Sequence, residues 1–406
     1  MSASRTNLGL ALVAALLLIL QSAALGTIAT NKGLGWDGED YARMLDVGIE
    51  RGTPNTRLRP LIVLLGRPVF AATGDPIATF RVMNVVYAAL LAWSLASLAD
   101  AYGASRLSKA YFVVTLGLSI STTGMFAYYP VLIDLGAYAV FSLTLLAMVR
   151  ERWTTAGILL VLAALSREFV VALLAFAVIR EVRTIRPWGH AARLLAGTLI
   201  PCVATVVAVR AWSTAVDGNQ ALTVGALLAN VELWADPWYA ALFGYFLATV
   251  FGGVSAIVLV GWRPVVTLFR AEPEWLAYAA TVGAFSAVGN ADIWRYLAYL
   301  LPVAAVLFVR CADSYKPAWR WGVLTVGAVV TVATQGPFRA MSVDRYFGDW
   351  FPYYVLTGKM EVPWAVSQVW TWRLRGLLAA VVLLAIVNLL AWWPREVPRL
   401  PSRIGG

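Results

Sequence analysis

Gly35-Trp36-Asp37-Gly38-Glu39-Asp40-Tyr41-Ala42-Arg43 is the segment around which the rest of the chain is arranged. It places three carboxylates within four residues, directly after an apolar run over residues 7–29. That run is long enough to cross a bilayer, because a helical span needs about 20 apolar residues. Since only 22 of the 406 residues are Asp or Glu, this cluster of acids indicates a functional loop at a membrane surface.

The composition is that of an integral membrane protein. Hydrophobic residues make up 60% of the chain and charged residues 13%, whereas a soluble domain has about 25% charged residues. The mean hydropathy is +0.73, and 18 Trp and 16 Tyr residues suit the aromatic belts of a membrane interface. The net charge of +10 does not indicate a nucleic-acid partner, because Lys and Arg collect in the cytoplasmic loops of membrane proteins.

Apolar runs recur along the whole chain and predict an all-α polytopic membrane protein. They cover residues 7–29, 78–99, 108–128, 130–149, 154–180, 192–212, 237–260, 275–289, 293–310, 319–335 and 373–393. Ser166-Arg167-Glu168 interrupts the segment 154–180, and two short helices that meet at this turn avoid burying two charges at mid-membrane. Counted in this way, residues 1–406 form a single transmembrane domain of about 12 membrane helices.

The charges of the loops predict the topology. Arg5 places the N-terminus in the cytoplasm, and a basic tail with Arg395, Arg399 and Arg403 places the C-terminus there as well. The arginine-rich loop at 180–193 is also cytoplasmic, and the first run is interpreted as a retained helix. Residues 30–77 then form the first extracytoplasmic loop, in which the apolar piece Leu61 to Ala72 is too short to span and predicts an interfacial helix. Residues 336–372 form a late extracytoplasmic loop, and residues 261–271 and the tail 394–406 are cytoplasmic. We expect the cytoplasmic face to carry bases and almost no carboxylates.

The outer face, by contrast, is expected to combine carboxylates, arginines and aromatic residues. A carboxylate can act as a general base toward an acceptor hydroxyl, and a guanidinium group can bind a phosphate leaving group through paired hydrogen bonds. The pattern therefore suits a phosphate-linked lipid whose head group lies at the outer interface. The residues of this face are Asp37, Glu39, Asp40, Tyr41, Arg57, Arg59, Tyr128, Tyr129, Asp134, Arg167, Glu168, Glu232, Asp236, Trp238, Asn290, Asp292, Arg295 and Tyr296.

Each of these features also has a purely structural interpretation. The acidic cluster would favour the first turn of the helix that follows, the arginines of the first loop would be interfacial anchors, and Asp134 would be a helix cap. Arg167 and Glu168 would form a structural ion pair. No cluster of Cys and His suggests zinc. The acids could hold Mg²⁺ or Ca²⁺, but nothing in the sequence requires a metal or another cofactor.

Four short motifs, in this order and topology, resemble those of the GT-C superfamily of polyprenyl-phosphate-dependent glycosyltransferases. Asp37-Gly38-Glu39-Asp40-Tyr41-Ala42 looks like the first-loop aspartate motif, and Arg59-Pro60-Leu61 is similar to the start of the second interfacial helix. Leu165-Ser166-Arg167-Glu168 is similar to the Lys/Arg-Glu turn between two short helices. Asp292-Ile293-Trp294-Arg295-Tyr296-Leu297, followed by Pro302, resembles the late Arg-Tyr-Leu helix.

The resemblance implies an inverting transfer from a polyprenyl-phosphate-sugar donor to a glycan or lipid acceptor, on the extracytoplasmic side of a bacterial-type plasma membrane. Asp37 would be the catalytic base, with Asp40 as the runner-up, and Arg59, Arg167 or Arg295 would hold the donor phosphate. Because no large soluble domain follows the last helix, a small acceptor is expected. The remaining substrate-binding residues would be Glu39, Tyr41, Arg57, Tyr129, Asp134, Glu168, Asp292 and Tyr296.

Two other functions are open at the level of the sequence. A transporter or flippase for lipid-linked glycans would need internal symmetry and ionisable residues deep in several helices, and neither is clear here. An O-antigen-type polymerase or ligase would use an outer loop rich in arginine. The late loop, with Arg339, Arg345 and Lys359, keeps that alternative open.

Overall fold

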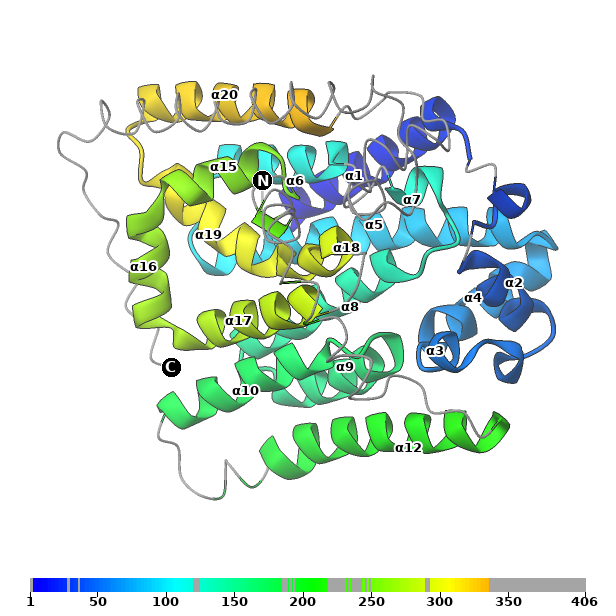
Figure 1. Ribbon diagram of the computed structural model, residues 1–406. Coiled ribbons are helices and arrows are strands. Elements are labelled where there is room, and N and C mark those ends of the chain that lie inside the picture. The colour runs from blue at the N-terminus through cyan, green and yellow to red at the C-terminus, as the bar shows by residue number, and fades with distance from the viewer. Residues whose placement is uncertain are drawn as a thin grey trace.

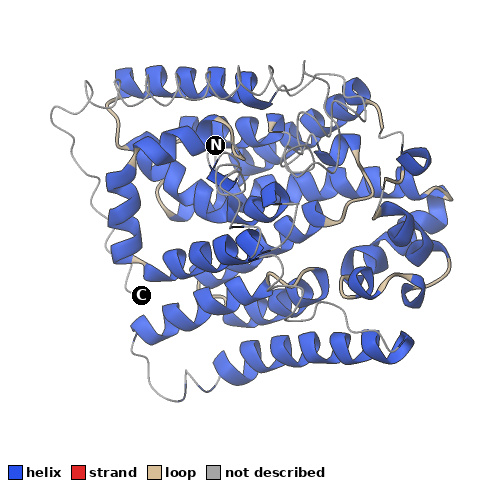
Figure 2. Cartoon of the chain, viewed as in Figure 1, coloured by secondary structure: helices blue, strands red, loops and turns tan. Residues whose placement is uncertain are grey.

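The computed structural model describes residues 3–27, 30–35, 37–119, 125–184, 194–217, 250–288 and 293–335, with seven single positions between 189 and 247. All regular secondary structure in this part of the chain is helical (Figure 2), so the predicted all-α class is confirmed. The late loop 336–372, the run 373–393, the tail 394–406 and most of residues 237–249 lie outside the described residues.

Several helices have the length and composition of membrane spans. In the described ranges they are Ser4–Leu25, Pro76–Ala101, Ala196–Val216 and Arg295–Asp313. Shorter apolar helices of 10 to 17 residues accompany them. The chain is therefore a polytopic membrane protein, as predicted, while the total of about 12 membrane helices stays a prediction.

The centre of the bundle contains α5 (Pro76–Ala101) and α8 (Asp134–Val149), and α1 (Ala3–Leu25) lies beside α5 with one face exposed. Helix α5 packs against α1 and α8 (Figure 1) and is buried along most of its length. It starts at Asp75, whose carboxylate accepts a hydrogen bond from the Ile77 amide at 2.8 Å, and Pro76 occupies its first turn. An aspartate followed by proline favours the start of a helix. The aspartate side chain binds a free amide of the first turn, and the fixed φ angle of proline suits the first helical position.

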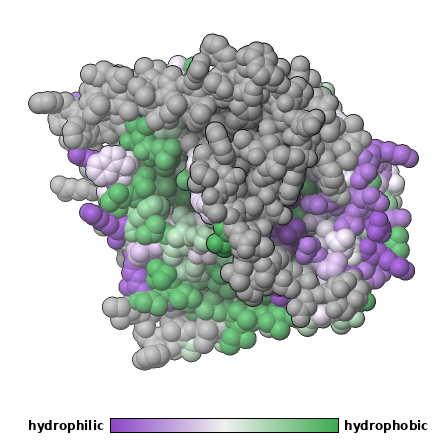
Figure 3. Space-filling view, viewed as in Figure 1, coloured by the Kyte–Doolittle hydropathy of each residue, from purple (hydrophilic) through white to green (hydrophobic). Residues whose placement is uncertain are grey.

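The first loop folds into three helices at one end of the bundle, which we call the loop end. They are α2 (Gly38–Asp46), α3 (Pro54–Arg57) and α4 (Pro60–Thr73), on the right in Figure 1. Hydrophilic residues gather along the same edge of the surface in Figure 3. Helix α4 corresponds to the predicted interfacial helix, and it buries Leu61 while leaving Leu65 50% exposed. A short helix with an exposed apolar face is suited to a membrane interface.

The segment 154–180 is broken where the sequence predicted. Helix α9 (Trp153–Ser166) ends before Arg167, and α10 (Val170–Thr184) begins after Phe169. Helix α9 packs against α8, whereas α10 packs against α17 (Pro273–Val288). The break brings Arg167 and Glu168 back to the loop end, so neither charge lies in the middle of a continuous span.

Residues 261–271, which were expected to form a loop, contain a helix, and their place on the cytoplasmic side stays a prediction. Helix α16 (Trp262–Ala271) follows α15 (Gly253–Val260) after a bend of 77°. Its sequence alternates polar and apolar positions at helical spacing, so a search for continuous apolar runs does not detect it. Trp262 is 60% exposed, which suits an aromatic side chain at a membrane interface.

Two predicted runs each contain more than one helix. Residues 108–128 include α6 (Arg106–Leu118) and the short α7 (Met125–Tyr128). Residues 293–310 include α18 (Ile293–Leu297), a 3-10 turn and the start of α19 (Leu301–Asp313). A π-helical turn, Leu195–Leu199, precedes α12 (Ile200–Asp217), and α20 (Pro317–Gln335) is the last described helix.

The opposite end of the bundle, which we call the far end, also contains carboxylates. On the predicted topology this end faces the cytoplasm, where almost no carboxylates were expected. Glu274, at the start of α17, is fully buried, and one of its oxygens accepts hydrogen bonds from Arg180 at 3.3 Å and Arg183 at 2.7 Å. Nearby, Glu272 accepts a hydrogen bond from the Tyr102 hydroxyl at 2.6 Å. Both acids lie in the sequence between two predicted apolar runs, and the two arginines that pair with Glu274 come from the distant helix α10.

Helices α15 and α20 pack with their backbones in direct contact. Gly253 faces the backbone of Gly327, and its amide donates a hydrogen bond to the Thr331 hydroxyl at 2.9 Å. A methyl group in Gly253→Ala would overlap the Gly327 backbone, which cannot move aside as a flexible side chain would. We expect this variant to lose about 1–3 kcal/mol of stability, measured as a lower thermal midpoint in detergent.

Gly322→Ala is the matched control on α20, because nothing lies within 4 Å of the added carbon. Its thermal midpoint should stay unchanged or rise slightly, since alanine favours the helix over glycine. An equal loss in both variants would contradict the proposed backbone packing.

Candidate active site

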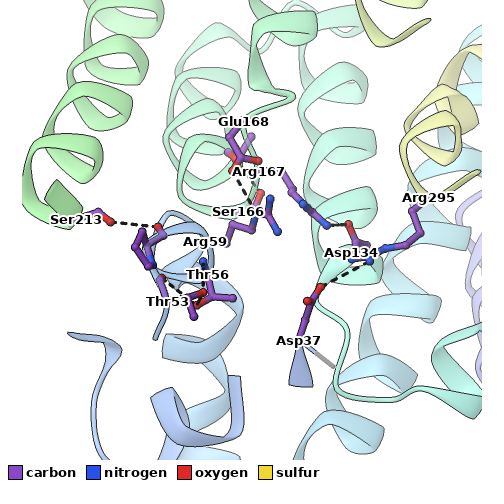
Figure 4. A network of polar contacts seen from close by, with 12 residues as sticks. Asp37, Thr53, Thr56, Arg59, Asp134, Ser166, Arg167, Glu168, Ser213 and Arg295 are labelled. Atoms are coloured by element: carbon purple, nitrogen blue, oxygen red, sulfur yellow. Dashed lines mark hydrogen bonds and ion pairs between the residues drawn. The ribbon is translucent and has the colours of Figure 1, made fainter. Parts of the chain in front are cut away.

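Asp37 lies at the loop end, immediately before α2. It occupies the N-cap position of this helix, but its carboxylate makes no capping hydrogen bond. The side chain is 46% exposed, and one carboxylate oxygen lies 3.8 Å from Nη1 of Arg295. Asp37 therefore presents an accessible carboxylate beside a guanidinium group (Figure 4).

Arg295 is held from its other side by Asp134, the first residue of α8. One Asp134 oxygen accepts a hydrogen bond from Arg295 Nη2 at 2.5 Å, and the other accepts from Arg167 Nη2. The carboxylate is completely buried, and burial of a charge is tolerated when it is paired and hydrogen-bonded. One buried acid thus fixes two guanidinium groups from separate helix ends, which leaves one positive charge in excess within this trio.

Arg59 and Glu168 form a second ion pair at the same end. Arg59 Nε lies 3.2 Å from a Glu168 oxygen, and both side chains are mostly buried. Burial alone would raise the pKa of Glu168, but the guanidinium groups of Arg59 and Arg167 hold that pKa below its usual value. The glutamate therefore stays ionised and anchors Arg59 at the break between α9 and α10, close to Arg167.

Two tyrosines complete the surroundings of these charges. Tyr41, on α2, is fully buried, and its hydroxyl makes no hydrogen bond to the part of the chain that the structure describes. Burial raises the pKa of Tyr41, so the phenol is neutral near the charges of Arg59 and Arg167. The Arg167 guanidinium lies 5.9 Å from the ring centre of Tyr296, within the range of a cation–π contact.

Other residues predicted for the site lie at its edge. Glu39 and Asp40 face Arg43 on the exposed side of α2, at 3.1 Å and 3.9 Å. Arg57 is buried and donates hydrogen bonds to the carbonyl oxygens of Glu50 at 3.1 Å and Ser213 at 3.4 Å, so it ties the first loop to α12.

Tyr129 packs against the segment around Asp37, where its hydroxyl accepts a hydrogen bond from the Gly38 amide. Asp292 lies outside the described residues.

One residue of this region was not predicted from the sequence. The hydroxyl of Tyr138 donates a hydrogen bond to the backbone carbonyl of Arg295 at 2.7 Å. Tyr138 follows Asp134 by one helical turn, so both lie on the same face of α8. That spacing is visible in the sequence and could have identified Tyr138 as a second contact to the Arg295 segment.

The chemistry of this arrangement is that of an anion site beside a base. Arg59, Arg167 and Arg295 converge on one end of the bundle, and Asp37 is the most exposed of the three acids paired with them. Among the described residues, no group of three or more His, Cys, Asp or Glu is placed to hold a metal ion. Guanidinium groups bind phosphate oxygens through paired hydrogen bonds, and a carboxylate beside them can accept a proton.

Comparisons with known proteins find the same fold among solved structures. No family model matches this sequence, and no curated protein matches it. Two crystal structures of ArnT from Cupriavidus metallidurans are similar, one in the apo state and one bound to undecaprenyl phosphate. Their sequence identity with this chain is 14% and 16%, respectively. Each superposition covers 94% of this chain and 74% of the ArnT chain, with a TM-score of 0.56. This likeness shows that the chain shares the fold of ArnT over most of its length.

Proposed function

We propose that this chain is a membrane glycosyltransferase that moves a sugar from a polyprenyl-phosphate donor to an extracytoplasmic glycan or lipid acceptor. The observation that carries the proposal is the placement of Asp37 beside Arg295, within a group of three arginines at the loop end. The fold is shared with a protein whose structure contains undecaprenyl phosphate. A base and a phosphate-binding group side by side are the two parts that this reaction needs.

The reaction follows from these two parts. An acceptor hydroxyl attacks the anomeric carbon of the donor sugar, while Asp37 takes the hydroxyl proton as general base. A new carbon–oxygen bond forms to the acceptor, and the bond from the anomeric carbon to the phosphate oxygen breaks. The polyprenyl phosphate leaves with the electron pair of that bond, and Arg295, Arg167 or Arg59 stabilises its developing negative charge. Attack opposite the leaving group inverts the configuration of the sugar.

The proposed orientation places the loop end outside the cytoplasm. The first loop follows α1, whose first turn contains Arg5, and Arg180 and Arg183 lie at the far end. Positive residues are enriched on the cytoplasmic side of membrane proteins. The proposed substrates are therefore a lipid-linked sugar in the outer leaflet and an acceptor that reaches the same surface.

A transfer assay tests the function directly. Purified protein in liposomes is incubated with polyprenyl-phosphate-linked radiolabelled sugars and a panel of glycan and lipid acceptors, and products are separated by chromatography. The proposal requires a covalent product and release of polyprenyl phosphate. Movement of an intact lipid-linked glycan across the bilayer, without a covalent product, would overturn the proposal in favour of a carrier.

Arg59 is predicted to contribute to donor binding. Because charge-assisted hydrogen bonds to phosphate are strong, Arg59→Ala should raise the KM for the donor about tenfold, which corresponds to about 1.4 kcal/mol. Steady-state kinetics over a range of donor concentrations measure this change. Arg51→Ala removes an exposed arginine from the same loop and should leave the KM unchanged; a similar rise in both variants would indicate general attraction of the anionic lipid.

A further inference from the structure

The start of α2 departs from the usual pattern of a helix capped by aspartate. An aspartate at the N-cap normally accepts a hydrogen bond from an amide of the first turn. Asp37 occupies this position with backbone angles of −75° and −21°, and its side chain forms no such bond. The carboxylate is instead turned toward Arg295. Another group must therefore satisfy the amides that the aspartate leaves open.

Tyr129 supplies that group from 91 residues away in the chain. Its hydroxyl oxygen accepts a hydrogen bond from the Gly38 amide, the first amide of α2, at 3.1 Å. The tyrosine is 3% exposed and lies between α7 and α8. Burial, together with the negative charge of Asp37, raises the pKa of Tyr129, so a neutral phenol oxygen satisfies the first amide of α2.

The glycines beside Asp37 allow the tyrosine ring to approach the backbone. Gly35 has a φ of +69°, and a β-carbon at this position would overlap the Tyr129 ring. A β-carbon at Gly38 would lie 3.3 Å from the same ring and 3.0 Å from Val131. The ring thus packs directly on the backbone that carries Asp37, and both the left-handed conformation and the close contact require glycine at position 35.

From these contacts we infer that Tyr129 is a positioning residue for Asp37: it binds the first amide of α2 and packs on the backbone beside Asp37, so that the carboxylate is held facing Arg295. This inference rests on the proposed function, in which Asp37 is the base. The rigid, buried ring fixes the backbone that carries Asp37, and through it the place of the carboxylate beside Arg295.

The test is Tyr129→Phe, which keeps the ring and removes the capping oxygen. We expect kcat to fall about tenfold, because small displacements of a catalytic group cost large factors in rate, while the KM values for donor and acceptor stay within about twofold. Tyr87→Phe removes the hydroxyl of another buried tyrosine, whose ring packs against α8 at Gly136, and should leave kcat unchanged. Gly35→Ala, which displaces the ring, should reproduce the Tyr129→Phe effect.

A second readout does not depend on turnover. Labelling of carboxylates with a water-soluble carbodiimide, followed by peptide mass spectrometry, reports how accessible Asp37 is. In Tyr129→Phe the backbone that carries Asp37 loses the hydrogen bond to its first amide, so labelling of Asp37 should change while labelling of exposed Asp46 stays constant. Unchanged labelling of Asp37 would overturn the inference, even if the wild-type protein transfers no sugar.

The kinetic outcomes also separate the alternatives. A rise in KM with constant kcat would show that Tyr129 contacts substrate and does not act through Asp37. A lower thermal midpoint with normal turnover per folded molecule would show a purely structural role. Absence of any transfer by the wild-type protein would reject the proposed function, and the labelling result would then decide the positioning role of Tyr129 by itself.

Discussion

Asp37→Asn is expected to lower kcat by about 100- to 10,000-fold, the range that general base catalysis contributes. The amide keeps the size of the side chain and cannot accept the acceptor proton. Because Asp37 is 46% exposed and 3.8 Å from Arg295, the change should have little effect on folding. Turnover of a labelled donor by purified protein, compared at equal amounts of folded enzyme, measures the loss.

Two neighbouring acids provide controls for Asp37. Asp46→Asn makes the same chemical change at the exposed end of α2, and its kcat should equal that of the wild type. Asp40, the runner-up for the base, faces Arg43 at 3.9 Å, and Asp40→Asn should reduce kcat only slightly. If Asp40→Asn abolished transfer and Asp37→Asn did not, the assignment of the base would be reversed.

The second large effect is expected from Asp134→Asn. The variant leaves Arg167 and Arg295 with no buried carboxylate between them. Loss of one partner of a buried ion pair costs about 3–5 kcal/mol, and an amide oxygen still accepts one hydrogen bond, so we expect about 3 kcal/mol. A markedly lower thermal midpoint in detergent, with weaker binding of the donor, is the predicted result.

Asp75→Asn is the matched control for this charge change. Asp75 is exposed and caps α5 through the Ile77 amide, and asparagine caps helices as well as aspartate does. Its thermal midpoint should therefore match that of the wild type. A midpoint for Asp134→Asn equal to that of Asp75→Asn would mean that the two arginines do not depend on Asp134.

Local sequence features predicted much of the fold because they act over short distances. Long apolar runs require helices in a membrane, and the charges of Arg167 and Glu168 require a break in the run that contains them. The first loop and its short apolar helix followed from the same reasoning. Helix α16 was not predicted from the apolar runs, because its apolar residues occupy one face of the helix and do not form a continuous run.

The candidate site was predictable in its residue types but not in its pairings. The four motifs placed Asp37, Arg59, Arg167 and Arg295 on one face. The sequence gives no sign, however, that Asp134 lies between two arginines 33 and 161 residues away. The contact from Tyr129 to Gly38 likewise spans 91 residues. Such pairings depend on how the helices pack against one another. Neither the hydrophobic periodicity of the sequence nor the number of charges in each loop specifies that packing.

The cluster at the far end has a consequence for how the chain is assembled during synthesis. Arg180 precedes Glu274 by 94 residues, so the ribosome completes α10 well before α17 emerges, and chains made from the N-terminus build their early parts first. Arg180 and Arg183 are therefore already present when the helix that contains Glu274 is made. In a chain that lacked α10, Glu274 would be buried without either arginine, and loss of the partners of a buried charge costs about 3–5 kcal/mol, so the packing of α17 depends on a helix made much earlier.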